Sequence, residues 1–304
     1  MNLGMLRCIA VVAVTAVLAG SGANASADES RPGRANAVPK AVIVAAGDIA
    51  CAPRAYVGPR RCRQEATARA AEALNADRVL ALGDLQYETG SFPDFLASYG
   101  NSWGLLKPKT WPVVGNHEYK TPRARGFFRY FDRQTEAPGY YRRTINGWQV
   151  FVLNSNCDRI DCQRERNWLK NRLIAHPSRC ALIAMHHPRF SSGSEHGSNA
   201  GMKPFWEIAQ RYGVDLVLSG HDHDYERFRV QNSTGHADPE GMQQLVVGTG
   251  GKSLRPMGTR AAGSLRFLDD WFGVLKLTVR PLGWSWQFRD TALNLRDSGS
   301  SACR

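Results

Sequence analysis

Short apolar runs recur along the chain from Ala41 onward, and several of them end in a glycine followed by a polar residue. Continuous apolar runs of this kind are typical of buried strands, and segments of helical composition separate some of them. The predicted strands are residues 41–48, 78–84, 110–117, 180–187, 214–221, 243–251, 272–279 and 284–288, and the predicted helices are residues 64–76, 163–175 and 204–212. Strands that alternate with helices predict α/β layers.

A hairpin is predicted over residues 140–155. Asn146 and Gly147 separate two β-rich runs there, and this dipeptide favours a tight primed turn. Together with the late strands, the hairpin predicts a sheet that is not purely parallel. Because no linker-like segment interrupts residues 41–304, we expect them to form one domain.

The N-terminal region has the features of a secretory signal peptide over residues 1–25. The apolar run of residues 8–19 follows Arg7 and precedes small residues at 23–25 that resemble a cleavage site. This run is shorter than the ~20 residues that a membrane-spanning helix needs, so we expect no transmembrane segment. A buried N-terminal helix is the weaker interpretation, because glycine and serine residues interrupt the run. We therefore expect an exported protein, with a polar linker over residues 26–40.

Six cysteines remain after the signal peptide. An even number in an exported chain predicts a disulfide framework, although six cysteines allow about 15 connectivities. Proximity in sequence favours the pairs Cys51–Cys62 and Cys157–Cys162. The cysteines that remain would form the pair Cys180–Cys303. None of these pairs has C-x-x-C spacing, which disfavours a thiolate metal site.

The formal net charge of +12 is strongly basic. Such a field attracts phosphate-rich molecules. The basic residues are nevertheless scattered, and no nucleic-acid-binding motif is present. A basic soluble surface is the favoured interpretation, and we expect no more than a loose attraction to an anionic cell envelope.

Four predicted strands end in a glycine followed by a side chain that can bind a metal. These pairs are Gly47-Asp48, Gly83-Asp84, Gly115-Asn116 and Gly220-His221. One such pair alone is typical of a turn. Ligands of open α/β sheets bind beyond the carboxyl ends of the strands, so we expect these four side chains to converge.

Three further side chains near strand ends extend this set. Tyr87 lies three residues after Asp84, and His186 ends the strand of residues 180–187. His223 lies two residues after His221, a spacing that turns both imidazoles to one side if the backbone is extended. Carboxylate, amide and imidazole ligands suit two divalent or trivalent metals that share one bridging carboxylate.

The ordered blocks GDIA, GDLQY, GNHE, IAMHHP and GHDHDYER resemble the motifs of the calcineurin-like metallophosphoesterase superfamily, specifically its purple acid phosphatase branch. The resemblance covers residues 41–251 and is closest to secreted bacterial members without the N-terminal β-sandwich domain of plant-type members. It implies an α/β fold, a four-layer α/β/β/α sandwich of two mixed sheets flanked by helices. It also implies that residues 41–304 are a single metallophosphoesterase catalytic domain.

The resemblance assigns a ligand set to two metal ions. Asp48, Tyr87 and His223 would hold the first ion, Asp84 would bridge, and Asn116, His186 and His221 would hold the second. Many relatives outside this branch have a histidine at position 50, where this chain has alanine and offers Tyr87 instead. A phenol with a pKa of ~10 becomes a ligand at neutral pH only beside a strongly polarising cation. Fe(III) is therefore expected in the Tyr87 site, and Fe(II), Zn or Mn in the second.

Two histidines outside the ligand set have catalytic roles implied by the resemblance. His117 would contact the phosphate or the leaving group, and His196 would donate a proton to the leaving group, although a solvent-exposed loop histidine is the other interpretation of His196. His187 is expected to be structural. Residues expected either to support the metal-binding loop or to begin a solvated helix are Asp224, Glu226 and Arg227.

The implied function is that of a secreted phosphomonoesterase, in which a metal-bound hydroxide attacks a small phosphorylated substrate. The alternative within the superfamily is a phosphodiesterase, and residues 88–109 and 189–203, which are expected to wall the pocket, would decide between the two. A remote alternative is a non-enzymatic protein that binds phosphate or the cell envelope. The complete ligand set disfavours that alternative.

Overall fold

The computed structural model of the 304-residue chain describes residues 10, 13, 39–135 and 137–304. Apart from residues 10 and 13, the predicted signal peptide lies outside the described residues, as does all of the predicted linker except its last two residues. Among the residues described, no helix combines the length and apolar character needed to cross a membrane.

The first of two mixed sheets has six strands in the order β13-β12-β11-β1-β2-β3. These strands are β1 (Ala41–Ala46), β2 (Arg78–Leu82), β3 (Thr110–Val113), β11 (Gly273–Arg280), β12 (Gly283–Asp290) and β13 (Leu295–Ala302). β1, β2 and β3 are parallel, with Val44 opposite Val79, whereas β11 pairs with β1 in the antiparallel sense. The parallel strands therefore send their carboxyl ends to one edge of this sheet.

The second sheet has seven strands in the order β10-β8-β9-β7-β6-β5-β4. They are β4 (Tyr141–Ile145), β5 (Trp148–Val152), β6 (Ala181–Ala184), β7 (Leu216–Ser219), β8 (Tyr225–Phe228), β9 (Gln243–Val247) and β10 (Ser264–Leu268). β5, β6, β7 and β9 are parallel. The predicted hairpin is confirmed as β4 and β5, with positive φ angles at Asn146 and Gly147.

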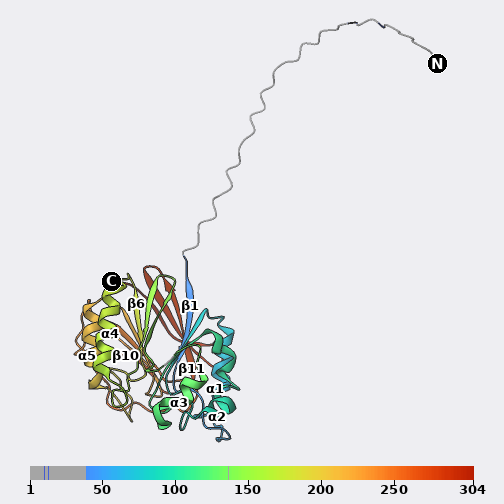
Figure 1. Cartoon of the computed structure of the whole chain (residues 1–304), viewed down its shortest axis with the longest axis vertical. Helices are drawn as coiled ribbons and strands as arrows, with labels where there is room; N and C mark the ends of the chain where they lie inside the picture. The colour runs from blue at the N-terminus through green and yellow to red at the C-terminus, as the bar shows by residue number, and fades with distance from the viewer. Residues whose placement is uncertain (1–9, 11–12, 14–38, 136) are drawn as a thin grey trace, which may run out of the picture. The chain divides into compact units, whose positions relative to one another are not determined.

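Helices cover the outer face of each sheet, with α4 and α5 on one side of the molecule and α1 and α2 on the other (Figure 1). Their bounds are α1 (Gln64–Ala73), α2 (Phe92–Asp94), α3 (Arg125–Tyr130), α4 (Cys162–Ala175) and α5 (Lys203–Arg211). Shorter helical turns are η1 (Phe95–Tyr99), η2 (Trp103–Lys109), η3 (Glu118–Lys120), η4 (Pro122–Ala124) and η5 (Ala200–Met202). The predicted four-layer α/β/β/α sandwich is confirmed.

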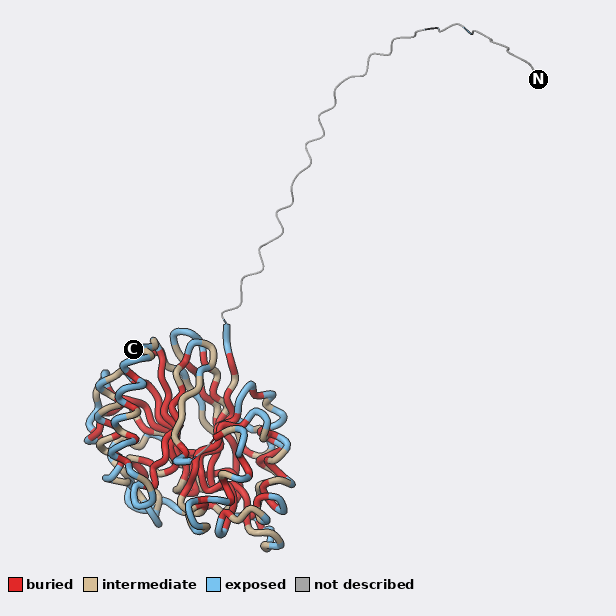
Figure 2. The backbone as a smooth tube through the Cα atoms, viewed as in Figure 1, coloured by how far each residue is buried: buried red, intermediate tan, exposed pale blue. Residues whose placement is uncertain are grey.

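Alternation along the strands divides the core into two parts. Val150 and Leu182 belong to a cluster that also contains Leu277 of the opposite sheet, so this face of β5 and β6 packs between the sheets. Their neighbours Phe151 and Ile183 belong to a second cluster, which includes buried residues of α4 and α5. Successive side chains on a strand point to opposite faces, which explains the division. The central strands are accordingly buried, while helices, loops and the outer strands carry the exposed positions (Figure 2).

The described residues contain three disulfides, and their pairing is the predicted one. Cys51 bonds with Cys62, and Cys157 bonds with Cys162, so that each closes a short segment. The third joins Cys180, just before β6, to Cys303, just after β13. Because β6 and β13 belong to different sheets, this bond ties the two sheets together near the C-terminus.

Candidate metal centre and active site

The predicted ligands lie just beyond the carboxyl ends of strands from both sheets. Asp48 and Asp84 follow β1 and β2, His186 follows β6, and His221 follows β7. The glycines between strand and ligand leave the space that neighbouring ligands need. A Cβ atom at Gly115 would lie 2.2 Å from the backbone nitrogen of Asp84. The repeated glycine thus reflects close approach of the strand ends as well as turning.

The four residues expected around the first metal are in contact. The phenolic oxygen of Tyr87 lies 2.8 Å from Oδ1 of Asp48, 3.1 Å from Oδ2 of Asp84 and 3.0 Å from Nε2 of His223. All four side chains are buried. These residues are called the Tyr87 cluster below.

The residues expected around the second metal meet at His186. Its Nε2 lies 3.4 Å from Oδ2 of Asp84, 3.1 Å from Oδ1 of Asn116 and 3.2 Å from Nδ1 of His221. These four residues are called the His186 cluster. Asp84 belongs to both clusters, and ligand atoms of Asp48, Asp84 and His186 lie within 4.8 Å of one another. The geometry therefore has the shared carboxylate that a dinuclear centre requires.

Hydrogen bonds orient two of the imidazoles toward the clusters. Nδ1 of His186 donates to the carbonyl oxygen of Leu82 over 2.8 Å, so Nε2 faces the other members of the His186 cluster. Nδ1 of His223 lies 2.7 Å from Oγ of Ser253, which leaves Nε2 facing Tyr87. Such partners fix ring orientation in metal sites. Sequence reasoning missed Ser253, which lies two residues after the end of the GTGG run at Gly251.

The His221–His223 segment is not extended, so the prediction that an extended backbone turns both imidazoles to one side does not apply. His221 has a φ of 73°, and its backbone N–H donates to Oδ2 of Asp48 over 2.8 Å. The N–H of Asp222 bonds to the carbonyl of Gly220, which tightens the turn. The two imidazoles consequently enter different clusters, His221 beside His186 and His223 beside Tyr87.

The electrostatics of the site fit bound cations. Burial, together with the carboxylates of Asp48 and Asp84, raises the pKa of the Tyr87 phenol well above its usual value. Burial lowers the pKa of His186, but Asp84 outweighs this and raises it to about 10. Both groups thus hold protons that a metal ion must displace, as is general for metal ligands. Two buried carboxylates, a buried phenol and converging imidazoles form a donor set that suits two such ions.

Glu118 organises the backbone around Asp84 and was missed as a site residue. Its carboxylate accepts hydrogen bonds from the backbone N–H groups of Asp84, Leu85, Gln86 and Gly115, over 2.8–3.2 Å. One buried side chain therefore binds the exits of both β2 and β3. Its only signal in the sequence is its place at the end of the GNHE block.

His117 lies beside the Tyr87 cluster. Its backbone N–H donates to Oδ1 of Asp84 over 2.8 Å, and its ring centroid lies 4.2 Å from that of Tyr87. Nδ1 lies 2.7 Å from the carbonyl oxygen of Glu88, and Nζ of Lys120 lies 3.0 Å from Nδ1 and 3.3 Å from Nε2. Burial lowers the pKa of His117, against the opposing effect of Asp84.

His196 lies beside the His186 cluster. Its ring is stacked on that of His221, with centroids 4.1 Å apart and planes at 22°. Nη1 of Arg255 lies 2.9 Å from its Nε2. Although His196 is exposed, it is therefore held against a candidate metal ligand. His187 contacts Oγ of Ser155 over 2.8 Å and has a ring nitrogen within the same 4.8 Å group as His186 and His221.

The segment after His223 is a strand, so its interpretation as a solvated helix start is wrong. Residues 225–228 form β8, which pairs with β9 and β10. Glu226 accepts a hydrogen bond from the backbone N–H of Ser192 over 2.8 Å, and Asp222 accepts one from Oγ of Ser191. These two acids anchor the start of the loop that carries His196. Arg227 pairs with Asp297 of β13 over 2.8 Å.

Asp224 is buried between these two acids. In the described part of the chain neither of its carboxylate oxygens has a hydrogen-bond partner. Burial and the charges of Asp222 and Glu226 raise its pKa well above the usual value. A buried carboxyl group without a partner is stable only when it is neutral.

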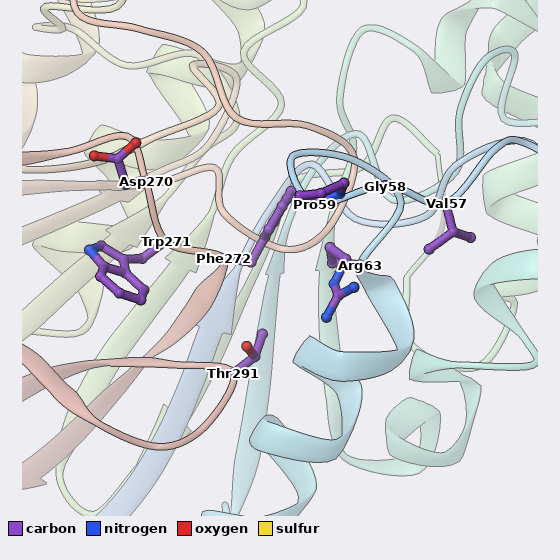
Figure 3. A pocket seen from close by; sticks show the side chains of 8 residues that line it. All are labelled: Val57, Gly58, Pro59, Arg63, Asp270, Trp271, Phe272 and Thr291. Atoms are coloured by element: carbon purple, nitrogen blue, oxygen red, sulfur yellow. The ribbon is translucent and has the colours of Figure 1, made fainter.

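A surface pocket of about 480 Å³ lies elsewhere, between the start of α1 and the segment before β11 (Figure 3). It is lined by Val57, Gly58, Pro59, Arg63, Asp270, Trp271, Phe272 and Thr291. None of the candidate metal ligands or catalytic histidines lines it. The pocket therefore adds nothing to the metal centre.

The sequence model of the family "Calcineurin-like phosphoesterase" matches residues 41–225. The chain belongs to this family, and the match begins at β1 and ends at the first residue of β8. It is a metal-dependent phosphoesterase related to purple acid phosphatases.

Relatives within the family agree with this. Human tartrate-resistant acid phosphatase type 5 is 26% identical over 235 residues, which are 66% of this chain and 72% of the human protein. Purple acid phosphatase 22 of Arabidopsis thaliana is 29% identical over 239 residues, 69% of this chain and 54% of the plant protein. A purple acid phosphatase from yellow lupin (Lupinus luteus) seeds has the same fold, with a TM-score of 0.73, 17% identity and coverage of 87% of this chain and 54% of the lupin chain. The chain thus spans about half the length of these two plant proteins.

Proposed function

We propose that the chain is a secreted phosphomonoesterase whose dinuclear metal centre hydrolyses small phosphorylated substrates. The observation that carries the proposal is the position of Asp84, which contacts Tyr87 on one side and His186 on the other. A single carboxylate between two sets of ligands is the arrangement that a bridged metal pair needs.

In this proposal each cluster holds one ion. Asp48, Tyr87 and His223 hold the first, Asn116, His186 and His221 hold the second, and Asp84 serves both. The phenol favours Fe(III) in the first position, since only a strongly polarising cation displaces its proton. Fe(II), Zn or Mn would suit the second. Two such ions would supply positive charge that binds a phosphoryl group and Lewis acidity that activates water.

The two histidines outside the ligand set would manage charge and protons. With Nδ1 of His117 donating to the Glu88 carbonyl, Nε2 carries a proton only in the imidazolium form, which a bound anionic phosphoryl group would favour. That proton would then donate a hydrogen bond to a phosphoryl oxygen and offset its charge. Nε2 of His196 accepts from Arg255, so Nδ1 is the nitrogen that would hand a proton to the leaving alkoxide.

Support for export comes from the three disulfides, which persist mainly in oxidising compartments. Support for monoesters comes from relatives that are named acid phosphatases. Phosphodiesterase activity is the competing proposal within the same centre.

The test is hydrolysis of p-nitrophenyl phosphate against bis-p-nitrophenyl phosphate by metal-loaded protein. We expect kcat/KM for the monoester to exceed that for the diester by about tenfold or more. Asp84→Asn should lose activity together with at least one of its metal ions. Asp158→Asn, an exposed aspartate paired with Arg159, is the matched control and should behave like the wild type. A diester preference would favour the phosphodiesterase, and two bound metals without turnover would favour a binding protein.

A further inference from the structure

Each of the two candidate catalytic histidines has a cationic side chain within hydrogen-bond distance. Nζ of Lys120 lies 3.0 Å from Nδ1 of His117, and Nη1 of Arg255 lies 2.9 Å from Nε2 of His196. Lys120 is the last residue of η3, whereas Arg255 follows β9 by eight residues. The two cations therefore reach the site from separate elements, one beside the Tyr87 cluster and one beside the His186 cluster.

A third cation, Lys252, lies near the Tyr87 cluster. Its Nζ is 4.5 Å from the centroid of the Tyr87 ring, and it forms an ion pair with Glu88. Arg255 forms an ion pair with Glu195 over 3.1 Å. The side chains of Glu88 and Glu195 are both 54% exposed, so solvent screens them and they can move away.

Lys120 differs from the other two cations. It is exposed and, within the described residues, forms no direct ion pair, although its charge still acts on the carboxylate of Glu88. Its side chain contacts the ring of His117. Because Glu88 is paired directly with Lys252, the charge of Lys120 stays available to a ligand.

The reacting phosphoryl group does not need these cations if the metal ions and His117 bind it as proposed. Lys120 contacts His117 and Arg255 contacts His196, the two histidines that would touch the phosphoryl group and the leaving group. A neutral leaving group offers these cations no partner. A leaving group with its own anionic substituent would pair with Lys120, or with Arg255 in place of Glu195.

We propose that the preferred substrates are phosphomonoesters whose leaving group carries a second anionic group, a phosphate or a carboxylate, which Lys120 recognises together with Arg255. This inference rests on the proposed phosphomonoesterase function and narrows its substrate class. A charge-assisted contact at a partly exposed site should change affinity by about two- to tenfold.

Binding is measured first, because it does not depend on turnover. Ethylphosphonate and 3-phosphonopropionate share the phosphonate and differ by a carboxylate at the far end, and calorimetry on metal-loaded protein gives both dissociation constants. We expect 3-phosphonopropionate to bind about three- to tenfold more tightly to the wild type. Lys120→Gln should remove most of this difference. Lys170→Gln, which changes an exposed lysine of α4, should keep it.

Turnover is measured next with glucose 6-phosphate and glucose 1,6-bisphosphate. The kcat/KM ratio in favour of the bisphosphate should exceed the twofold statistical factor in the wild type and fall in Lys120→Gln through a rise in KM. An equal loss for both sugars would mean that Lys120 only holds His117, and would overturn the inference. An affinity ratio that is the same in the wild type and Lys120→Gln would also overturn it. Absence of all hydrolysis with the affinity ratio intact would instead refute the proposed phosphomonoesterase.

Discussion

The phenolic oxygen of Tyr87 donates a hydrogen bond to Oδ1 of Asp48 over 2.8 Å, although the two residues follow different strands. The contact exists because β1 and β2 are parallel neighbours whose carboxyl ends meet. Ala50 continues this neighbourhood, since its N–H bonds to the carbonyl of Leu85. The phenol therefore enters the site from the segment after β2, and the alanine at position 50 offers no ligand of its own.

Replacing Tyr87 by phenylalanine removes the proposed phenolate and keeps the buried ring. We expect the variant to fold, to lose a visible charge-transfer band and to hold its first metal less well, because one anionic ligand is gone. The measurement is the absorption spectrum of protein purified from its native producer, with iron assayed in the same sample. A colourless, iron-free and active wild type whose Tyr87→Phe variant keeps full activity would contradict the ferric assignment and leave the phosphoesterase assignment intact.

His117 and His221 should respond differently to truncation. His117→Ala should keep two metals and lose kcat by ~10²–10⁴-fold, since it removes only a charge-stabilising group. His221→Ala should lose metal and activity together, because its ring belongs to the His186 cluster. Metal content and kcat of both variants decide the matter. Loss of a metal in His117→Ala would show that the role assigned to His117 is wrong.

The Cys180–Cys303 disulfide should contribute more to stability than the Cys157–Cys162 disulfide. The first spans 123 residues and the second 5. Loop-closure entropy then predicts that replacing the first pair by alanine costs roughly 5 kcal/mol of unfolding free energy, and the second roughly 2 kcal/mol. Denaturant unfolding of the two double variants measures this. Equal losses of stability in the two double variants would contradict this prediction. Titratable thiols among the six cysteines of the three disulfides, in denatured and unreduced wild type, would contradict the pairing itself.

Glu165 should make the protein less stable as the pH rises. It is buried in α4, and in the described chain only its Oε1 has a partner, the backbone N–H of Asn154 at 2.7 Å. Burial raises its pKa to about 8. The folded state then keeps a proton that the unfolded state releases, so the associated stability is complete below the unfolded pKa and declines until about pH 8.

Glu165→Gln is neutral at every pH and keeps an acceptor for Asn154. Between pH 5 and pH 8, the unfolding free energy of the wild type should therefore fall relative to that of the variant, on the order of 3 kcal/mol. Urea unfolding at several pH values provides the comparison. Parallel stability curves for the two proteins would show that Glu165 is ionised in the folded state.

Central strands such as β1 and β7 could be predicted because each is a short apolar run followed by glycine. β13 could not, because LRDSGSSA is polar and has no apolar face. Its place depends on distant partners. Asp297 accepts hydrogen bonds from Tyr225 and Arg227 of the other sheet, and Gly299 leaves the room that the ring of Trp286 occupies. None of these contacts is visible in a local pattern.

The candidate ligands could be predicted as a group, since glycine plus a polar side chain at parallel strand ends has a topological meaning. Their supports could not. Glu118 binds four backbone N–H groups and Ser253 contacts His223, yet no local sequence pattern indicates these contacts. The positive φ of His221, which separates the two imidazoles of the His-Asp-His segment, likewise follows from tertiary contacts.

The number of metal ions bound per chain tests the central claim most directly. Elemental analysis of purified wild type should find two ions per chain, and Asp84→Asn should retain no more than one, because Asp84 is the ligand common to both clusters. The Asp158→Asn control should retain two. If Asp84→Asn bound the same number of ions as the wild type, Asp84 would not bridge two metals and the dinuclear assignment would be contradicted.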